Sequence, residues 1–381
     1  MLFSFENPTK IHFGEGQISQ LRHAIPKDKK VLMLYGGGSI KSNGVYEQVV
    51  AALSDHQWGE FSGIEANPQY DTLMKAVTLI KTQGYDYLLA VGGGSVVDGC
   101  KFIAVAVNYD GDPWEILSQG KHATSALPIG CVLTLPATGS ESNIASVVSR
   151  GQDKLSFLDP QVRPQFAILD PAVTLSLPPR QVANGVVDAF VHVIEQYLTY
   201  DHGAQVQDRY SEGLMLVLTN EGPRALADPQ NMAVRSNVMW AATMALNGLI
   251  GAGVPQDWTT HQIGHELTGL YGVDHGRSLT IILPAVMKAR RGPKGDKIVQ
   301  LGERVFGIHH GDRDQRIEAT IAAVTEFFRS MGTPTSLKEI NVGEDAIEQI
   351  LSQLAKHGAQ GLSERGDIGP AELKKILLLA V

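Results

Sequence analysis

The sequence of 381 residues has little cysteine, no concentrated positive charge and no long uninterrupted apolar run. Its two cysteines, Cys100 and Cys131, each stand alone in an apolar run, which excludes a disulfide framework and indicates buried thiols in a reducing cytoplasm. No block of five or more Lys and Arg residues occurs, and the formal net charge is -8. We therefore expect no nucleic-acid partner and no anionic membrane surface.

Targeting and membrane segments are also lacking. The N-terminal stretch MLFSFENPTKIHF has no basic region and loses its apolar character at Glu6, so no secretory signal is predicted. The longest uncharged run, residues 237–256, is interrupted by Asn247 and three glycines. A membrane span needs about 20 predominantly apolar residues, so this run is typical of a buried core helix in a soluble protein.

The first half of the chain alternates strand-like and helical patterns, and the second half is helical. The expected strands lie at 30–35, 85–95, 128–138 and 165–170, and two of them run into glycine-rich turns. Strand, turn and helix in repetition predict a parallel sheet with crossover helices. The later helices are expected at 179–199, 204–221, 231–250, 257–270, 276–290, 296–307, 313–331 and 344–357. We predict an α/β dinucleotide-binding domain over 1–177 and an all-helical domain over 178–381.

Two glycine turns, YGGGSIK (35–41) and VGGGSVVD (91–98), each follow a strand and open a helix. Glycines let backbone N–H groups approach an anion, and a helix N-terminus favours negative charge. Neither turn has GxGxxG or Walker A spacing, and either one alone is also explained as a tight turn. Two such turns at one end of a sheet favour a dinucleotide, and the later turn LPATGSESN adds hydroxyl groups.

The first of these turns indicates which dinucleotide is used. A NAD site usually carries an acid after the strand to hold the ribose 2′-hydroxyl. Here the strand KVLMLY is followed by Gly37, Gly38, Ser39 and Lys41, which are small donors and a cation. This composition fits a 2′-phosphate, so we predict a preference for NADPH.

The histidines are informative through their spacing, because 12 of them occur. Asp188 and His192 are four residues apart, as are His261 and His265, and His275 follows in a glycine-flanked loop. On helices, such pairs share one face. They could form core hydrogen bonds, a proton-transfer pair or an N₃O site for Zn²⁺ or Fe²⁺.

The motifs together resemble the iron-containing (group III) metal-dependent alcohol dehydrogenases, most closely their NADPH-dependent aldehyde reductase branch. The match extends over essentially the whole chain through FGEG, YGGGSIKSNGV, NPQYDTLMKAV, LLAVGGGSVVDG, CVLTLPATGSESN, LPPRQVANGVVDAFVHVIEQY, NGLIGAGVPQDW, THQIGHELTGLYGVDHG and IILPA. The resemblance implies a dehydroquinate synthase-like fold, with a Rossmann-like domain, a helical domain and a metal in the cleft between them. It also implies a homodimer.

Carried over by position, the resemblance assigns the site residues. Its metal ligands fall on Asp188, His192, His261 and His275, and His265 matches a histidine that is usually not a ligand. Cofactor contacts are implied for Asn67, Gly93, Gly94, Ser95, Asp98, Thr134, Thr138 and Lys154, beside the Gly37, Gly38, Ser39 and Lys41 turn. NAD-using relatives carry an Asp at the position of Gly37. The ligand set suits Fe²⁺ and Zn²⁺, and the affinity order favours Zn²⁺.

The implied reaction is hydride transfer between NADPH and a short-chain aldehyde, or a primary alcohol in reverse. The metal polarises the substrate oxygen, and His265 or a cofactor ribose hydroxyl relays the proton. A cyclising synthase of the dehydroquinate synthase type is an alternative, but it needs a basic cluster where only Arg180 and Arg277 occur. A non-enzymatic protein that binds a metal or a nucleotide is the third possibility.

Overall fold

The computed structural model describes residues 2–381, and its contacts divide the chain into two compact units. The α/β unit consists of Glu6–Pro178 and Gln230–Thr243, and the helical unit consists of the residues up to Phe5 together with Pro179–Pro229 and Met244–Val381. The predicted domain boundary near 177 stays a prediction. The division into compact units follows it at Pro178 but also assigns the later segment 230–243 to the α/β unit. Among residues 2–381, no helix is long and apolar enough to cross a membrane.

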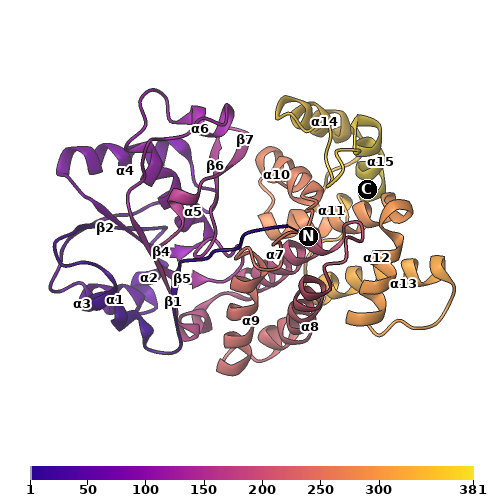
Figure 1. The fold of residues 1–381 in the computed structure, drawn as a ribbon, viewed down its shortest axis with the longest axis horizontal. Coiled ribbons are helices and arrows are strands. Elements are labelled where there is room, and N and C mark those ends of the chain that lie inside the picture. The colour runs from indigo at the N-terminus through magenta and orange to yellow at the C-terminus, as the bar shows by residue number, and fades with distance from the viewer. Residues whose placement is uncertain (1) are drawn as a thin grey trace. The chain divides into compact units, whose positions relative to one another are not determined.

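The α/β unit is built on a six-stranded, all-parallel sheet with the order β1-β8-β5-β4-β2-β3. Its strands are β1 (Lys10–Phe13), β2 (Lys30–Tyr35), β3 (Gln57–Phe61), β4 (Tyr87–Gly93), β5 (Ile129–Leu135) and β8 (Phe166–Leu169). Figure 1 labels four of these strands, β1, β2, β4 and β5. The parallel sheet and the helical second half confirm the predicted fold class. An antiparallel hairpin of β6 (Ala145–Arg150) and β7 (Asp153–Leu158) forms a second, two-stranded sheet that the sequence patterns did not predict.

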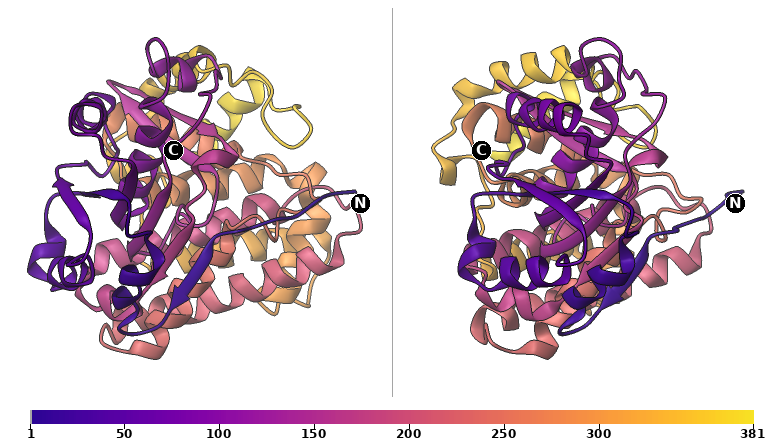
Figure 2. Two further views of the ribbon diagram at one scale, coloured as in Figure 1. Left: turned by 60° about the vertical axis from the view of Figure 1, so that its left-hand side comes forward. Right: turned by 90° about the vertical axis from the view of Figure 1, so that its left-hand side faces the viewer.

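Helices cover both faces of the sheet, which explains why the central strands are almost continuously apolar. On β2, Val31 and Met33 belong to one buried cluster, and Leu32 and Leu34 belong to the other. The first cluster is completed by η1 (Gln17–Gln20), α1 (Leu21–Ala24), α2 (Ser39–Ser42) and α3 (Val45–Ala52). The second is completed by α4 (Tyr70–Gln83), α5 (Gly94–Ala106) and α6 (Trp114–Ser118). Figure 2 shows this unit, in indigo to magenta, from two further sides.

The helical unit contains α7 (Pro179–Tyr197), α8 (Gln205–Ala227), α10 (Thr259–Tyr271), α11 (His275–Ala289), α12 (Arg291–Val305), α13 (Arg313–Ser330), α14 (Ile347–Lys356) and α15 (Pro370–Ala380). Most of α9 (Met232–Ala245) belongs to the α/β unit. Short 3-10 helices also occur at Pro160–Val162 and Pro171–Ser176 in the α/β unit and at Lys338–Ile340 and Glu344–Ala346 in the helical unit. The helix at 204–221 was expected to end before Pro223 but continues to Ala227, and α15 was not predicted. Helix α11 packs against α7, α10 and α15, so three segments distant in sequence meet.

Candidate metal centre and cofactor-binding edge

Helix α7 carries a stripe of four polar side chains, Asn184, Asp188, His192 and Glu195, on an otherwise apolar face. Their spacing of four, four and three residues places them on one side of the helix. Asp188, His192 and Glu195 are 3%, 4% and 4% exposed. Buried polar groups require partners, so the stripe has to meet polar groups or an ion from neighbouring elements.

The partners of Asp188 are three imidazole rings. Its Oδ1 lies 3.6 Å from Nδ1 of His192, 3.8 Å from Nε2 of His261 and 3.7 Å from Nε2 of His275. These separations are too long for N–H···O hydrogen bonds, which are about 2.7–3.2 Å long. Within residues 2–381, Nδ1 of His192 and Nε2 of His261 are buried and make no hydrogen bond. The three contacts of Asp188 Oδ1 are therefore not hydrogen bonds.

The spacing fits a divalent metal. Metal–ligand bonds of about 2.0–2.1 Å at tetrahedral angles put ligand atoms about 3.3–3.4 Å apart, close to the observed separations. Ligand atoms of Asp188, His261 and His275 all lie within 4.8 Å of one another. His192, the fourth predicted ligand, lies outside this tight group, and its ring stacks on that of His261 with centroids 4.6 Å apart. One carboxylate and three imidazoles suit Zn²⁺ and Fe²⁺ alike.

The charges of the two stacked histidines differ because their surroundings differ. Burial lowers the pKa of His192 to about 4, against an opposing effect of Asp188, so its ring is neutral at pH 7. Burial also disfavours the charged form of His261, but the carboxylates of Glu195 and Asp188 outweigh it and raise its pKa to about 9. In the absence of a metal, a proton on His261 balances these carboxylates, and a cation beside Asp188 would take its place.

Glu195 holds His261 from the side away from Asp188. Its Oε2 accepts from Nδ1 of His261, and its Oε1 accepts from the backbone N–H groups of Thr260 (2.6 Å) and His261 (3.2 Å). The sequence reasoning did not assign Glu195 a role. Its position seven residues after Asp188 and three after His192, on one helix face, was the signal that could have revealed it.

Asn184, at the other end of the stripe, holds the segment that carries His275. Its Nδ2 donates to Oδ2 of Asp274 at 2.8 Å, and Nε of Arg180 donates to the same oxygen at 2.7 Å. Asp274 immediately precedes α11, which His275 begins. A Cβ on Gly276 would lie 2.5 Å from the carbonyl oxygen of Asn184, so only glycine allows this close approach. Asn184 was also missed from sequence.

His265 lies one helical turn after His261 and is 8% exposed. Its ring centroid is 5.2 Å from that of His275 and 6.3 Å from that of His261. Of the predicted ligands, His275 has the most exposed side chain, at 22%. His265 is therefore adjacent to the predicted ligands on their more accessible side.

The predicted cofactor residues gather mainly at one edge of the sheet. Because β2, β3, β4 and β5 are parallel, the turns at their carboxyl ends meet there. They carry Gly37, Gly38, Ser39 and Lys41 after β2, Asn67 after β3, Gly93, Gly94 and Ser95 at the end of β4, and Thr134 and Thr138 at the end of β5. Strand order reverses direction between β2 and β4, the position at which such sheets bind ligands.

The glycines at this edge have room for a ligand or need to be glycine. Cβ atoms on Gly37 and Gly38 would meet no atom within 4 Å, and Gly38 has a φ of 96°, which favours glycine. A Cβ on Gly94 would collide with the side chain of Thr138. The turn after β2 therefore leaves space next to its backbone. The glycine at the start of α5 lets this helix pack closely against the turn that contains Thr138.

Three of the predicted cofactor residues have contacts that sequence did not reveal. Asp98 accepts from Ser140 Oγ at 2.5 Å and from the Val147 N–H at 3.0 Å, so both of its oxygens are used inside the α/β unit. Lys41 lies 3.7 Å from Glu60 Oε1 and over the ring of Tyr46. Lys154 lies on strand β7 of the hairpin, where it pairs with Ser149 of β6, and is buried.

Gly276→Ala tests the close approach of α11 to α7. We expect the added Cβ to move the first turn of α11, destabilise the protein by about 1–3 kcal/mol and weaken divalent-metal binding. Gly292→Ala is the matched control, because Gly292 is likewise the second residue of a helix and its Cβ would meet nothing within 4 Å. Urea unfolding and chelator competition measure both effects. Unchanged metal affinity in Gly276→Ala would show that the approach does not position His275.

Comparisons with known proteins match nearly the whole chain. The family model "Iron-containing alcohol dehydrogenase" matches residues 8–171, and "Fe-containing alcohol dehydrogenase family, C-terminal" matches residues 182–376. The chain is 54% identical over 371 residues to NADPH-dependent aldehyde reductase YqhD of Escherichia coli K12, covering 96% of each chain. It is 40% identical to NADP-dependent alcohol dehydrogenase 3 of Entamoeba histolytica, covering 91% of each. The crystal structure of E. coli K-12 YqhD superimposes with a TM-score of 0.99 at 52% identity, covering 100% of this chain and 99% of that one. The chain belongs to the iron-containing alcohol dehydrogenase family.

Proposed function

We propose that the protein is an NADP(H)- and metal-dependent alcohol dehydrogenase that works as an aldehyde reductase on short-chain aldehydes. The observation that carries the proposal is the single oxygen of Asp188 facing three imidazole nitrogens at 3.6–3.8 Å, a spacing that suits an ion and not hydrogen bonds. The second requirement is a dinucleotide site, and the open glycine turn after β2 and the glycine turn after β4 support one at the carboxyl ends of the strands. Relatives named as NADPH- and NADP-dependent enzymes support it.

In this proposal Asp188, His192, His261 and His275 hold one divalent metal, Zn²⁺ or Fe²⁺. When bound, the metal would supply Lewis-acid chemistry at the substrate oxygen, and NADPH would supply the hydride. The protein supplies the surroundings: the ligands are largely buried, so water is excluded and the charge that develops on oxygen is stabilised more strongly. Hydride would add to the carbonyl carbon and leave an alkoxide oxygen, which needs a proton, and a ring nitrogen of His265 is the proposed donor.

Two histidine variants separate the metal site from the proton donor. His261→Ala removes a ligand, so we expect loss of bound metal and of NADPH-dependent aldehyde reduction together. His265→Ala should keep the metal and lower kcat, by about 10²–10⁴-fold if it removes the general acid. Elemental analysis and steady-state kinetics on the same preparations provide the measurements. A fully active, metal-free His261→Ala protein would refute the metal site. An unchanged rate in His265→Ala would rule out His265 as the proton donor and leave the metal site standing.

The preference for NADPH is proposed to reside in the turn after β2. Gly37, Gly38 and Ser39 offer small side chains, and Lys41 offers a cation that would contact a 2′-phosphate. Glu60 already lies near Lys41, so the phosphate would share this lysine with a carboxylate. Asp98 would act indirectly, by positioning the Thr138–Ser140 turn through its bond to Ser140.

Comparing kcat/KM for NADPH and NADH tests this assignment. We expect the wild type to favour NADPH strongly, and Lys41→Ala to lower kcat/KM for NADPH about tenfold while leaving that for NADH nearly unchanged, since a charged hydrogen bond is lost. Lys27→Ala is the control, because Lys27 is an exposed lysine at the opposite, amino end of β2. Comparable wild-type turnover with the two cofactors would contradict the preference.

We further propose that the enzyme is a cytoplasmic homodimer, with its two free cysteines reduced and buried. Strand β1 is an edge strand, and edge strands are templates for pairing with another chain. Phe13, the last residue of β1, and Trp240 are 39% and 42% exposed and form an edge-to-face pair with ring centroids 5.5 Å apart. Such exposed aromatic pairs are typical of interfaces.

Light scattering coupled to size-exclusion chromatography tests the dimer. We expect the wild type to elute with the mass of two chains, and Phe13→Lys to shift it toward one chain because the charge would be buried at the interface. Leu158→Lys, at an apolar residue on β7 that is 63% exposed, is the control and should stay dimeric. A monomeric wild type would contradict the proposal.

A further inference from the structure

We infer that Glu195 is a positioning residue of the metal centre: it sets which nitrogen of His261 is available to the metal and fixes where α10 begins relative to α7. The inference rests on the proposed metal site and deepens it. Glu195 is 4% exposed, and it meets both the ring and the backbone of one ligand through hydrogen bonds to His261 and Thr260.

The first part of the argument concerns the start of α10. The residue before this helix, Trp258, makes no side-chain capping bond to the described chain, yet the first N–H groups of a helix require acceptors. Oε1 of Glu195 accepts from the N–H groups of Thr260 and His261, the second and third residues of the helix. A carboxylate near a helix N-terminus is also favoured by the helix dipole. A side chain of α7 therefore caps α10.

The second part concerns the imidazole of His261. A neutral imidazole has one N–H and one nitrogen lone pair, and its partners decide which nitrogen carries the proton. Nδ1 of His261 is engaged by Oε2 of Glu195, a carboxylate oxygen that can only accept. The proton of the neutral ring is therefore held at Nδ1, and the lone pair of Nε2 faces Asp188 Oδ1, 3.8 Å away. Carboxylates beyond a ligating histidine set the tautomer in this way.

The third part is the shared helix. Asp188, His192 and Glu195 all belong to α7, so their mutual positions are fixed by one helical backbone. Two of them are predicted ligands and the third holds another ligand by its ring and its backbone. The position of His261 is thereby tied directly to the helix that carries Asp188 and His192.

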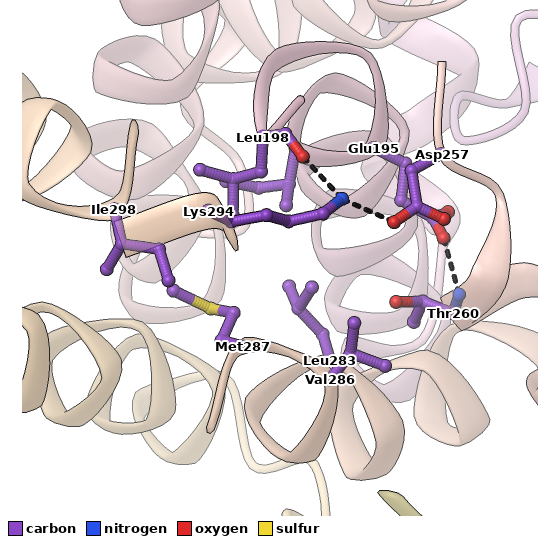
Figure 3. A pocket seen from close by; sticks show the side chains of 10 residues that line it. Glu195, Leu198, Asp257, Thr260, Leu283, Val286, Met287, Lys294 and Ile298 are labelled. Carbon is purple, nitrogen blue, oxygen red and sulfur yellow. Dashed lines mark hydrogen bonds and ion pairs between the residues drawn. The ribbon is translucent and has the colours of Figure 1, made fainter. Parts of the chain in front are cut away.

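The lysine near Glu195 makes its hydrogen bonds to other groups. Lys294 lines the same pocket as Glu195 and Asp257, but its ammonium group donates to Asp257 and to the carbonyl oxygen of Leu198, the latter at 2.6 Å (Figure 3). Glu364 Oε2 is a further 3.2 Å neighbour of this lysine. Lys294 is thus bonded to Asp257 and lies near Glu364, and the side-chain partner of Glu195 is the His261 ring.

Glu195→Gln tests the tautomer directly. The glutamine oxygen can still accept from the backbone of α10, but its NH₂ group would donate to Nδ1 of His261 and move the proton to Nε2, toward the metal. We expect the affinity for Zn²⁺, measured by competition with a chromophoric chelator, to fall by about 10–100-fold. We also expect the visible spectrum of the Co²⁺-loaded protein to change.

Two further variants distinguish this role from a structural one. Glu195→Ala also removes the acceptor for the first N–H groups of α10, so it should be less stable in urea than Glu195→Gln. Its affinity for Zn²⁺ should be no lower than that of Glu195→Gln. Glu266→Gln is the matched control, because Glu266 on α10 is buried and accepts from His357 Nδ1 at 2.7 Å, away from the predicted ligands. It should lose stability and keep its Zn²⁺ affinity within about threefold.

The outcomes are separable. Wild-type Zn²⁺ affinity and an unchanged Co²⁺ spectrum in Glu195→Gln would overturn the inference, and so would affinities that fall in the order of the variants' stabilities. A wild-type protein that binds neither Zn²⁺ nor Co²⁺ would overturn the proposed metal site itself.

Discussion

Everything in the candidate active site depends on one carboxylate oxygen surrounded by imidazole rings. Oδ1 of Asp188 faces nitrogens of His192, His261 and His275 at distances beyond hydrogen bonding. Burying such groups is costly unless an opposite charge compensates them. Burial lowers the pKa of His192 to about 4, whereas the carboxylates of Glu195 and Asp188 outweigh burial and raise the pKa of His261 to about 9. In the proposed site, a divalent ion would compensate the same carboxylates.

The helices of the helical unit pack closely enough to form the site because glycines occupy their contact positions. Side chains at Gly276, Gly264 and Gly222 would collide with Asn184, Leu279 and Val186, respectively, at 2.5–2.8 Å. These contacts join α11 to α7, α10 to α11 and α8 to α7. The polar stripe of α7 supplies two predicted ligands, Asp188 and His192, in its middle. The residues at its ends, Asn184 and Glu195, bond to the segments that carry the other two. One helix therefore serves as the reference for all four predicted ligands.

Local patterns allowed much of this to be predicted, and long-range contacts account for what was missed. Strand-like runs that end in glycine predicted the parallel sheet, and spacing placed Asp188 and His192 on one face without deciding between a hydrogen bond, a proton relay and a metal. Glu195 and Asn184 were missed because their partners lie 66 and 90 residues away. Helix α8 continues past Pro223 where Gly222 packs against Val186, so tertiary packing overrides a local stop signal. The hairpin β6–β7 showed no clear alternation of apolar residues.

The most direct test of the central claim is a crystal structure of the metal-loaded protein with anomalous diffraction data collected at the metal's absorption edge. We expect one strong peak per chain, about 2.0–2.2 Å from an oxygen of Asp188 and from one nitrogen each of His192, His261 and His275. A peak at another position, or a metal that contacts fewer than three of these four side chains, would contradict the assignment.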